Sequence, residues 1–129
     1  MTIDVNVYDS EKLVHAICTG LVTKEELFHF QDSIWSAGQH TGYDCIFDML
    51  KADFCKIRYS DLLEYARSAA MLDYGHPLTK LAVVVSTSQQ KILTEFYQAG
   101  LKLSSPSTRE IKITYSLDEA KDWIELVAS

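Results

Sequence analysis

The chain has 129 residues, about the length of one domain and enough to bury a core without disulfides. Hydrophobic residues make up 47% and charged residues 23%, a composition that excludes wholesale disorder. Eighteen acidic against 12 basic residues give a net charge of −6, which argues against a nucleic-acid binder because phosphate contacts need clustered positive charge. We therefore expect a single acidic domain spanning residues 1–129.

The sequence carries no sign of a membrane or of an oxidising compartment. Residues 1–4 lack a basic and apolar leader, and the longest apolar run, residues 81–85, is far shorter than the roughly 20 residues of a membrane span. The three cysteines form no CxxC pair, and the histidines form neither H-x-H nor H-E-x-x-H. We expect a cytoplasmic protein without a membrane span, a metal or a cofactor.

The N-terminal third predicts a hairpin followed by a helix. Residues 3–8 alternate between apolar and polar, which is typical of a half-buried strand. Turn-forming residues 9–11 and a second strand at residues 13–19 complete the hairpin. Thr23 begins a T-x-x-E capping box that predicts the start of a helix. The apolar face of this helix carries Leu27, Phe30 and Ile34.

The remainder repeats a strand–helix unit three times. The predicted strands are residues 45–47, 81–85 and 111–115. The predicted helix caps are Ser60-Asp61, the T-x-x-Q box that begins at Thr87, and the S-x-x-E box that begins at Ser116. A loop from Asp48 to Tyr59 separates the first strand from its helix. In that helix the small residues Ala66, Ala69 and Ala70 predict close packing on the sheet.

Strands that alternate with helices join in parallel through right-handed crossovers. Only the predicted strand at residues 81–85 has apolar side chains on both of its faces. In the other strands one face is apolar and the second carries both polar and apolar side chains. We therefore predict an α/β fold with a five-stranded mixed sheet. It consists of an N-terminal β-hairpin and a βαβαβα superhelix, with four main helices mostly on one face. A doubly wound sheet is the alternative.

Several motifs occur in an order that resembles a known family. They are Gly20-x-x-Thr23-x-Glu25, Phe47-Asp48, the run of residues 81–85, and the stretch from Ser116 to Ile124. Together they resemble the small bacterial SpoIIAA-like proteins of the STAS superfamily. The resemblance implies a stand-alone domain with a five-stranded mixed sheet, no catalytic centre and frequent homodimers. Relatives of that family include phospho-switched anti-sigma-factor antagonists and CRAL-TRIO-type lipid-binding domains.

Ligands of open α/β sheets collect beyond the carboxyl ends of the parallel strands. We therefore expect a ligand or partner, if there is one, at this edge of the sheet. The candidate residues are Asp48, Lys51, Lys56, Arg58, Ser86, Thr87 and Ser88. The basic residues among them suit an anionic ligand or an acidic peptide, while solvated loop charges are the alternative interpretation.

Two further residues of this region are candidates for chemistry. Ser60 stands at the helix start where the resemblance implies a phosphorylated serine, but the family's Asp-Ser-Ser-Gly pattern is absent and a plain N-cap explains Ser60 equally. Cys55, next to Lys56 and near Arg58, is the thiol with a setting suited to a lowered pKa.

Three hypotheses for the function follow. The first is a non-catalytic binding or regulatory domain that acts through a protein partner or as a homodimer. The second is a carrier of a lipid or other apolar ligand, which requires an apolar cavity between the helices and the sheet. The third is a cysteine-dependent enzyme that uses Cys55.

Overall fold

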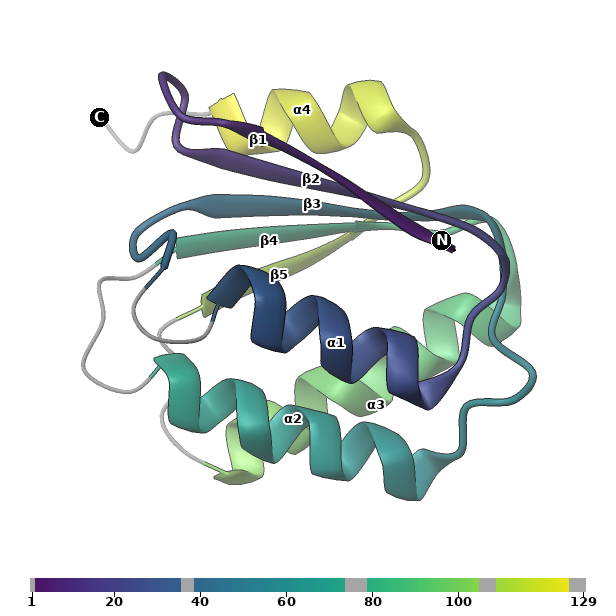
Figure 1. The fold of residues 1–129 in the computed structure, drawn as a ribbon. Coiled ribbons are helices and arrows are strands. Elements are labelled where there is room, and N and C mark those ends of the chain that lie inside the picture. The colour runs from purple at the N-terminus through teal and green to yellow at the C-terminus, as the bar shows by residue number, and fades with distance from the viewer. Residues whose placement is uncertain (1, 36–38, 74–78, 105–108, 126–129) are drawn as a thin grey trace.

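The computed structural model describes residues 2–35, 39–73, 79–104 and 109–125 (Figure 1). The strands are β1 (Ile3–Tyr8), β2 (Leu13–Leu21), β3 (Asp44–Asp53), β4 (Thr79–Val84) and β5 (Arg109–Thr114). The helices are α1 (Lys24–Trp35), α2 (Tyr59–Asp73), α3 (Ser88–Ser104) and α4 (Leu117–Glu125).

The five strands form one mixed sheet in the order β1-β2-β3-β4-β5. The hairpin pairs β1 and β2 antiparallel, and each later strand adds in parallel to the strand before it. This is the predicted hairpin followed by a βαβαβα superhelix. The α/β fold class is therefore confirmed.

The helices cover the two faces of the sheet unequally (Figure 1). Helices α1, α2 and α3 lie on one face, and α4 lies alone on the other. The larger core, on the face of α1–α3, includes Val14, Ala16, Cys18, Cys45, Leu81 and Val83. The smaller core, beneath α4, consists of Ile46, Ala82, Val84 and Ala120. The prediction that the helices lie mostly on one face is confirmed, and α4 is the exception.

Three helix starts carry the capping residues that the sequence predicts. The backbone N–H of Glu26 donates to Oγ1 of Thr23 (3.3 Å), and that of Glu119 donates to Oγ of Ser116 (3.1 Å). Gln90 in α3 makes the equivalent bond to Thr87 (3.1 Å). These bonds satisfy amide groups that the first turn of a helix leaves without a partner.

The start of α2 differs from the prediction. The helix begins at Tyr59, so Ser60 lies inside its first turn instead of capping it. The capping bond is made by Asp61, whose Oδ2 accepts from the backbone N–H of Arg58 (3.0 Å). Of the predicted pair Ser60-Asp61, Asp61 therefore makes the cap, as the bond from the third helical residue back to the amide of the residue before the helix.

The predicted loop from Asp48 to Tyr59 is wrong over its first half. Strand β3 continues to Asp53, because residues 51–53 pair with residues 19–21 of β2 beyond a register shift between Ile17 and Thr19. Gly20, one residue past the predicted strand of residues 13–19, lies within β2 at a φ of 70°. Pairing between two strands thus extends both of them past residues that would end an isolated strand.

No helix in the described ranges combines the length and the apolar character needed to cross a membrane.

Candidate ligand-binding cavity

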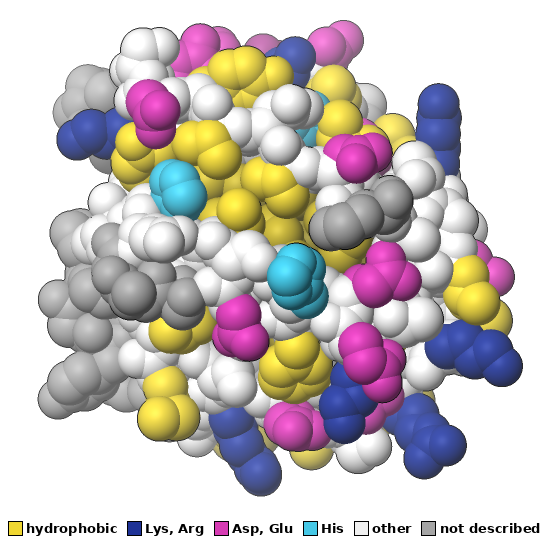
Figure 2. Space-filling view, in the orientation of Figure 1, with side chains coloured by type: hydrophobic (Ala, Val, Ile, Leu, Met, Phe, Trp, Pro, Cys, Tyr) yellow, Lys and Arg dark blue, Asp and Glu magenta, His cyan; other side chains and the backbone are white. Residues whose placement is uncertain are grey.

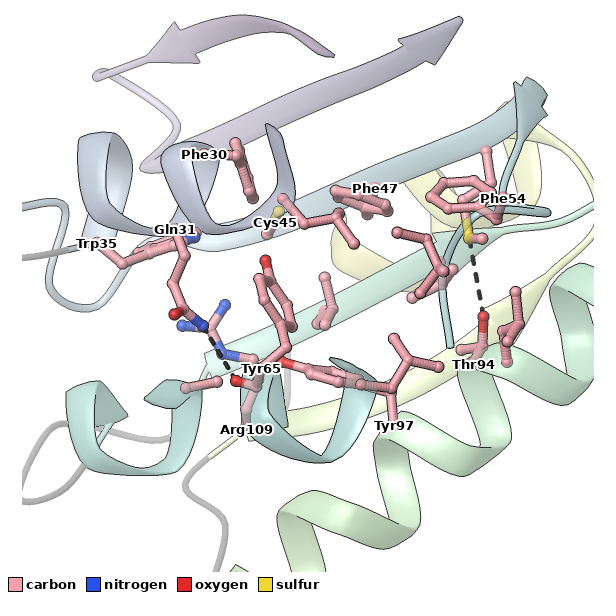
Figure 3. Close-up of a pocket in the computed structure, with 18 of the residues that line it drawn as sticks. Phe30, Gln31, Trp35, Cys45, Phe47, Phe54, Tyr65, Thr94, Tyr97 and Arg109 are labelled. Carbon is pink, nitrogen blue, oxygen red and sulfur yellow. Dashed lines mark hydrogen bonds between the residues drawn. The ribbon is translucent and has the colours of Figure 1, made fainter. Parts of the chain in front are cut away.

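A cavity of about 100 Å³ lies between the sheet and helices α1, α2 and α3 (Figure 3). Its described lining residues are Leu27, Phe30, Gln31, Trp35, Cys45, Phe47, Met49, Phe54, Ile57, Leu62, Tyr65, Ala69, Leu72, Leu81, Val83, Leu93, Thr94, Tyr97 and Arg109. Most of these side chains are apolar or aromatic, which is typical of sites for small organic ligands.

The cavity exists because α2 packs chiefly on its neighbouring helices. A Cβ atom placed on Gly100 of α3 would lie 3.0 Å from the Cβ of Ala66 in α2, so the two helices approach closely. Ala66, Ala69 and Ala70 form a buried cluster with Leu101 of α3. The predicted packing of these alanines on the sheet holds only in part: Ile111 of β5 contacts the cluster, but the buried partner of the alanines is Leu101 of α3. Leu62 and Tyr65 of α2 reach the core on this face of the sheet, and the cavity lies between them and β3 and β4.

Aromatic rings keep the walls of the cavity apart. The rings of Phe30 and Phe47 lie 5.7 Å apart between centroids, and those of Tyr65 and Tyr97 lie 5.6 Å apart. Phe28 packs edge-on against Tyr65 at 5.4 Å. Such pairs favour defined tilted or edge-to-face geometries. We infer that these contacts prevent the rings from collapsing into the space between them.

Polar groups gather at the end of the cavity where β5 begins (Figure 3). The guanidinium carbon of Arg109 lies 4.5 Å from the ring centroid of Trp35. Nε2 of the buried Gln31 donates to the backbone oxygen of Tyr65 (3.3 Å). Burial raises the pKa of the Tyr65 hydroxyl well above its ordinary value of 10, and a tyrosine is uncharged at neutral pH in any case. This end therefore combines a cation with uncharged hydrogen-bonding groups.

Beside the lining residues Met49 and Thr94, a hydrogen-bonded clamp joins β3 to α3. Nε2 of Gln90 donates to the backbone oxygens of Met49 (2.8 Å) and Ala52 (3.0 Å). Its Oε1 accepts from the backbone N–H of Ser86 (2.7 Å). Thr94 Oγ1 donates to the backbone oxygen of Gln90 (2.9 Å). Gln90 is only 4% exposed, so these bonds are made away from water and fix the distance between β3 and α3.

The predicted ligand edge is a different place from the cavity. Asp48, Lys51, Lys56, Arg58 and the segment 86–88 are absent from the described lining residues. Lys56, Arg58 and residues 86–88 are exposed.

Within that edge, the carboxylate and one lysine belong to a strand. Asp48 lies inside β3, where its Oδ1 accepts from the backbone N–H of Leu50 (2.9 Å), and Lys51 is an exposed residue of the same strand. Ser86 Oγ donates to the backbone oxygen of Leu50 at 3.4 Å, which joins the segment after β4 to β3. A ligand or partner at this edge stays a prediction.

Ser60 is exposed at the second position of α2. Its neighbour Asp61 bonds the backbone N–H of Arg58 and lies 3.7 Å from Nζ of Lys24. Asp61 places a negative charge on the residue next to Ser60, and a nearby carboxylate opposes a phosphate. Phosphorylation of Ser60 stays a prediction.

The setting of Cys55 differs from the expected one. Cys55 is exposed, but its pKa is raised, chiefly because its thiol hydrogen-bonds to Asp53. The positive charge of Lys56 lowers this pKa, but by less than Asp53 raises it. Burial raises the pKa of Cys45 to about 12, and burial also raises that of Cys18. Because the thiolate is the reactive form, these pKa values argue against a nucleophilic role for any of the three cysteines.

Sequence reasoning named such a cavity only as a requirement of the carrier hypothesis, and it identified neither the lining residues nor Arg109, the one cation among those that the structure describes. The signal for the cavity was the run of small residues in α2 together with Gly100, which permits close contact between helices. The sequence gives a weaker indication of Arg109, since a charged side chain at the start of a strand ordinarily points into solvent. Within the described residues, no group of three or more His, Cys, Asp or Glu is placed to hold a metal ion.

No protein-family model and no curated protein matches the sequence. The structure is similar to the crystal structure of an uncharacterised DUF3478-family protein with a SpoIIAA-like fold from Shewanella loihica PV-4, at a TM-score of 0.59. The similarity covers 95% of this chain and 91% of that chain, with 14% sequence identity. The chain has a SpoIIAA-like fold. At this identity the similarity shows the fold alone, which confirms what the resemblance implied about architecture.

Proposed function

We propose that this chain is a non-catalytic binding domain that holds a small apolar ligand between its sheet and helices α1–α3. The observation that carries the proposal is the cavity of about 100 Å³ with a mostly apolar lining. This is the cavity that the carrier hypothesis requires. The raised pKa values of the three thiols support the non-catalytic part of the proposal.

Energetics favour a ligand at this position. In an enclosed apolar core, unfilled space costs about 24 cal/mol per Å³, because the lining side chains lose contacts. An apolar ligand that restores these contacts would recover part of that free energy. For comparison, an engineered apolar cavity of about 150 Å³ takes up benzene. The cavity therefore suits a compact ligand of a few heavy atoms.

The direct test is the melting temperature in the presence of the neutral probes benzene and 1-hexanol. Binding to the folded state alone stabilises it by about 2.7 kcal/mol at a probe concentration of 100 Kd. Leu93→Phe enlarges a side chain that lines the cavity and should abolish this response. Leu103→Phe makes the same exchange on the same helix, at a side chain that is 85% exposed, and should leave the response intact.

Native mass spectrometry of freshly purified protein complements the melting experiment. A copurifying apolar mass that is present in the wild-type chain and lost in Leu93→Phe would support the proposal. Melting temperatures unchanged by every neutral probe, together with no copurifying mass, would overturn it.

A second candidate function, a regulatory domain that acts as a homodimer, is favoured by the edge strand β1. This strand lies at the edge of the sheet, and among the described residues it pairs with β2 alone. The side chains of its residues Val7 and Tyr8 are 36% and 44% exposed. Hydrophobic side chains gather between β1 and α1 on the molecular surface (Figure 2). An unpaired edge with apolar side chains is suited to pairing with a second copy.

The homodimer is tested by the molar mass in solution. Light scattering should give twice the 14.6 kDa of one chain, and Val7→Lys should return the mass to that of a monomer. A monomeric wild-type chain at all accessible concentrations would exclude this second candidate without affecting the first.

A further inference from the structure

We propose that the cavity takes an uncharged ring compound with a hydrogen-bond acceptor, such as a pyridine-type nitrogen, and that the hydroxyl of Tyr65 donates to this acceptor. The inference rests on the proposed function and narrows it to one chemical class of ligand. It is carried by a hydroxyl that lines a mostly apolar cavity and has no hydrogen-bond partner within the described part of the chain.

The hydroxyl of Tyr65 lies deep in the cavity. Figure 3 shows the Tyr65 side chain reaching from α2 toward β3, with its hydroxyl oxygen on the side of Cys45. Cys45 is 2% exposed, so this end of the ring lies within the core although the side chain as a whole is only partly buried. Burial is also the main reason why the pKa of this hydroxyl is raised. At neutral pH the hydroxyl is therefore an uncharged O–H group that faces the cavity.

The chain supplies no acceptor for this hydroxyl among its described residues. The side-chain bond that involves Tyr65 is made to its backbone, where the carbonyl oxygen accepts from Nε2 of Gln31 (3.3 Å). Polar groups inside proteins are nearly always hydrogen-bonded, because losing hydration without gaining a new bond costs free energy. A phenylalanine would fill the same space without this cost. We infer that the partner of the hydroxyl is a group that the chain itself does not provide.

Contacts on several sides hold the Tyr65 ring in place. Phe28 packs edge-on against it at 5.4 Å between centroids, and Tyr97 packs tilted against it at 5.6 Å. The bond from Gln31, a residue of α1 that is 2% exposed, ties the backbone of Tyr65 to the neighbouring helix. A donor that is fixed before binding loses little conformational entropy when a ligand arrives. The hydroxyl is thus positioned in advance for an acceptor in the cavity.

The hydroxyl and the lining together select the class of ligand. A tyrosine hydroxyl both donates and accepts, but its oxygen shares a lone pair with the ring and is the better donor. The walls include the rings of Phe30 and Phe47, which suit a flat apolar body. A charged ligand would lose its hydration in this mostly apolar space. An uncharged ring that carries an acceptor satisfies the hydroxyl and the walls at once.

The test compares benzene, pyridine and pyrrole, which are flat rings of similar size with no polar group, an acceptor and a donor. Calorimetric titration of the full chain at pH 8, where pyridine is uncharged, gives the Kd of each ring for the wild-type chain and for Tyr65→Phe. This substitution leaves the pyridine nitrogen without its donor, so pyridine should bind about tenfold or more weakly. The affinity for benzene should stay within about twofold, because benzene makes no bond to the hydroxyl.

A matched variant and the benzene titration serve as controls. Tyr115→Phe removes a tyrosine hydroxyl from a side chain that is 58% exposed, and it should leave all affinities unchanged. The affinity of Tyr65→Phe for benzene reports whether the walls of the cavity are intact in that variant. A selective loss of pyridine binding is therefore distinct from a general loss of structure.

The outcomes that overturn the inference separate it from the proposed function. If benzene binds and pyridine does not, or if Tyr65→Phe changes the two affinities equally, the hydroxyl is not the donor and the apolar cavity function stands. If pyrrole depends on the hydroxyl and pyridine does not, the ligand class is wrong and the cavity function again stands. If none of the rings binds the wild-type chain, the proposed function fails and this inference fails with it.

Discussion

The two faces of the sheet are covered in different ways. On one face α4 packs alone, and the four residues of the core beneath it are completely buried. On the other face, three helices cover a larger area and leave a cavity of about 100 Å³. The difference shows that one amphipathic helix can lie directly on a sheet, whereas helices that also pack closely on one another cannot all reach it. The cavity is thus a product of helix–helix packing.

The largest expected effects come from truncating one side chain on each face of β3. Ile46→Ala beneath α4 and Met49→Ala at the cavity should each lower the free energy of unfolding by about 2–5 kcal/mol. Only Met49→Ala enlarges an existing cavity, so benzene should restore stability to that variant and not to Ile46→Ala. Urea unfolding with and without benzene measures both. Equal rescue of the two variants would contradict the contrast between the faces.

A smaller loss is expected when the clamp beside the cavity is broken. Gln90→Met keeps the shape of the side chain but leaves the backbone oxygens of Met49 and Ala52 without their buried donor. Each unsatisfied buried group costs about 1–3 kcal/mol. Gln89→Met, at the exposed neighbouring position, is the control and should cost little. Equal unfolding free energies for the two variants would show that the clamp contributes nothing.

The sequence predicts the order of the elements well, because each helix begins at polar capping residues and each strand carries its own apolar pattern. The prediction fails where contacts between residues far apart in the sequence decide the length or the packing of an element. Strand β3 runs to Asp53 because β2 pairs with it there, and local residue preferences carry no record of that partner. The prediction of the candidate site fails for a related reason. Whether the alanines of α2 face the sheet or α3 depends on where α3 lies, and Arg109 lies at the cavity only because of that arrangement.

Neighbouring valines of β4 give a matched comparison of packing on the two faces. Val83 lines the cavity, and Val84 is completely buried beneath α4. Val83→Ile places an extra methylene into available space and should stabilise the fold by up to about 0.8 kcal/mol. Val84→Ile overpacks a filled core and should destabilise it by about 1 kcal/mol or more. Thermal unfolding measures both, and a stabilised Val84→Ile would show that the face beneath α4 also has unfilled space.

The smallest effect is expected from pH, and it arises on the face of α4. His15 in β2 is 8% exposed, and its Nε2 makes no hydrogen bond within the described part of the chain. Burial lowers the pKa of His15 below its ordinary 6.5, an effect that Asp48 opposes and Lys121 reinforces. Below about pH 6.5 the unfolded chain therefore binds more protons than the folded one, and the free energy of unfolding should fall as the pH falls.

Substitution isolates this contribution from the other titrating groups. His15→Gln removes the buried imidazole, so the decrease in unfolding free energy between pH 7.5 and pH 5 should become smaller than in the wild-type chain. Asn6→Gln, at an exposed position of β1, removes no titrating group and is the control. Urea unfolding across this pH range measures both variants. If His15→Gln keeps the full pH dependence, the imidazole is protonated as readily when folded as when unfolded, and the core beneath α4 is more open to water than its burial indicates.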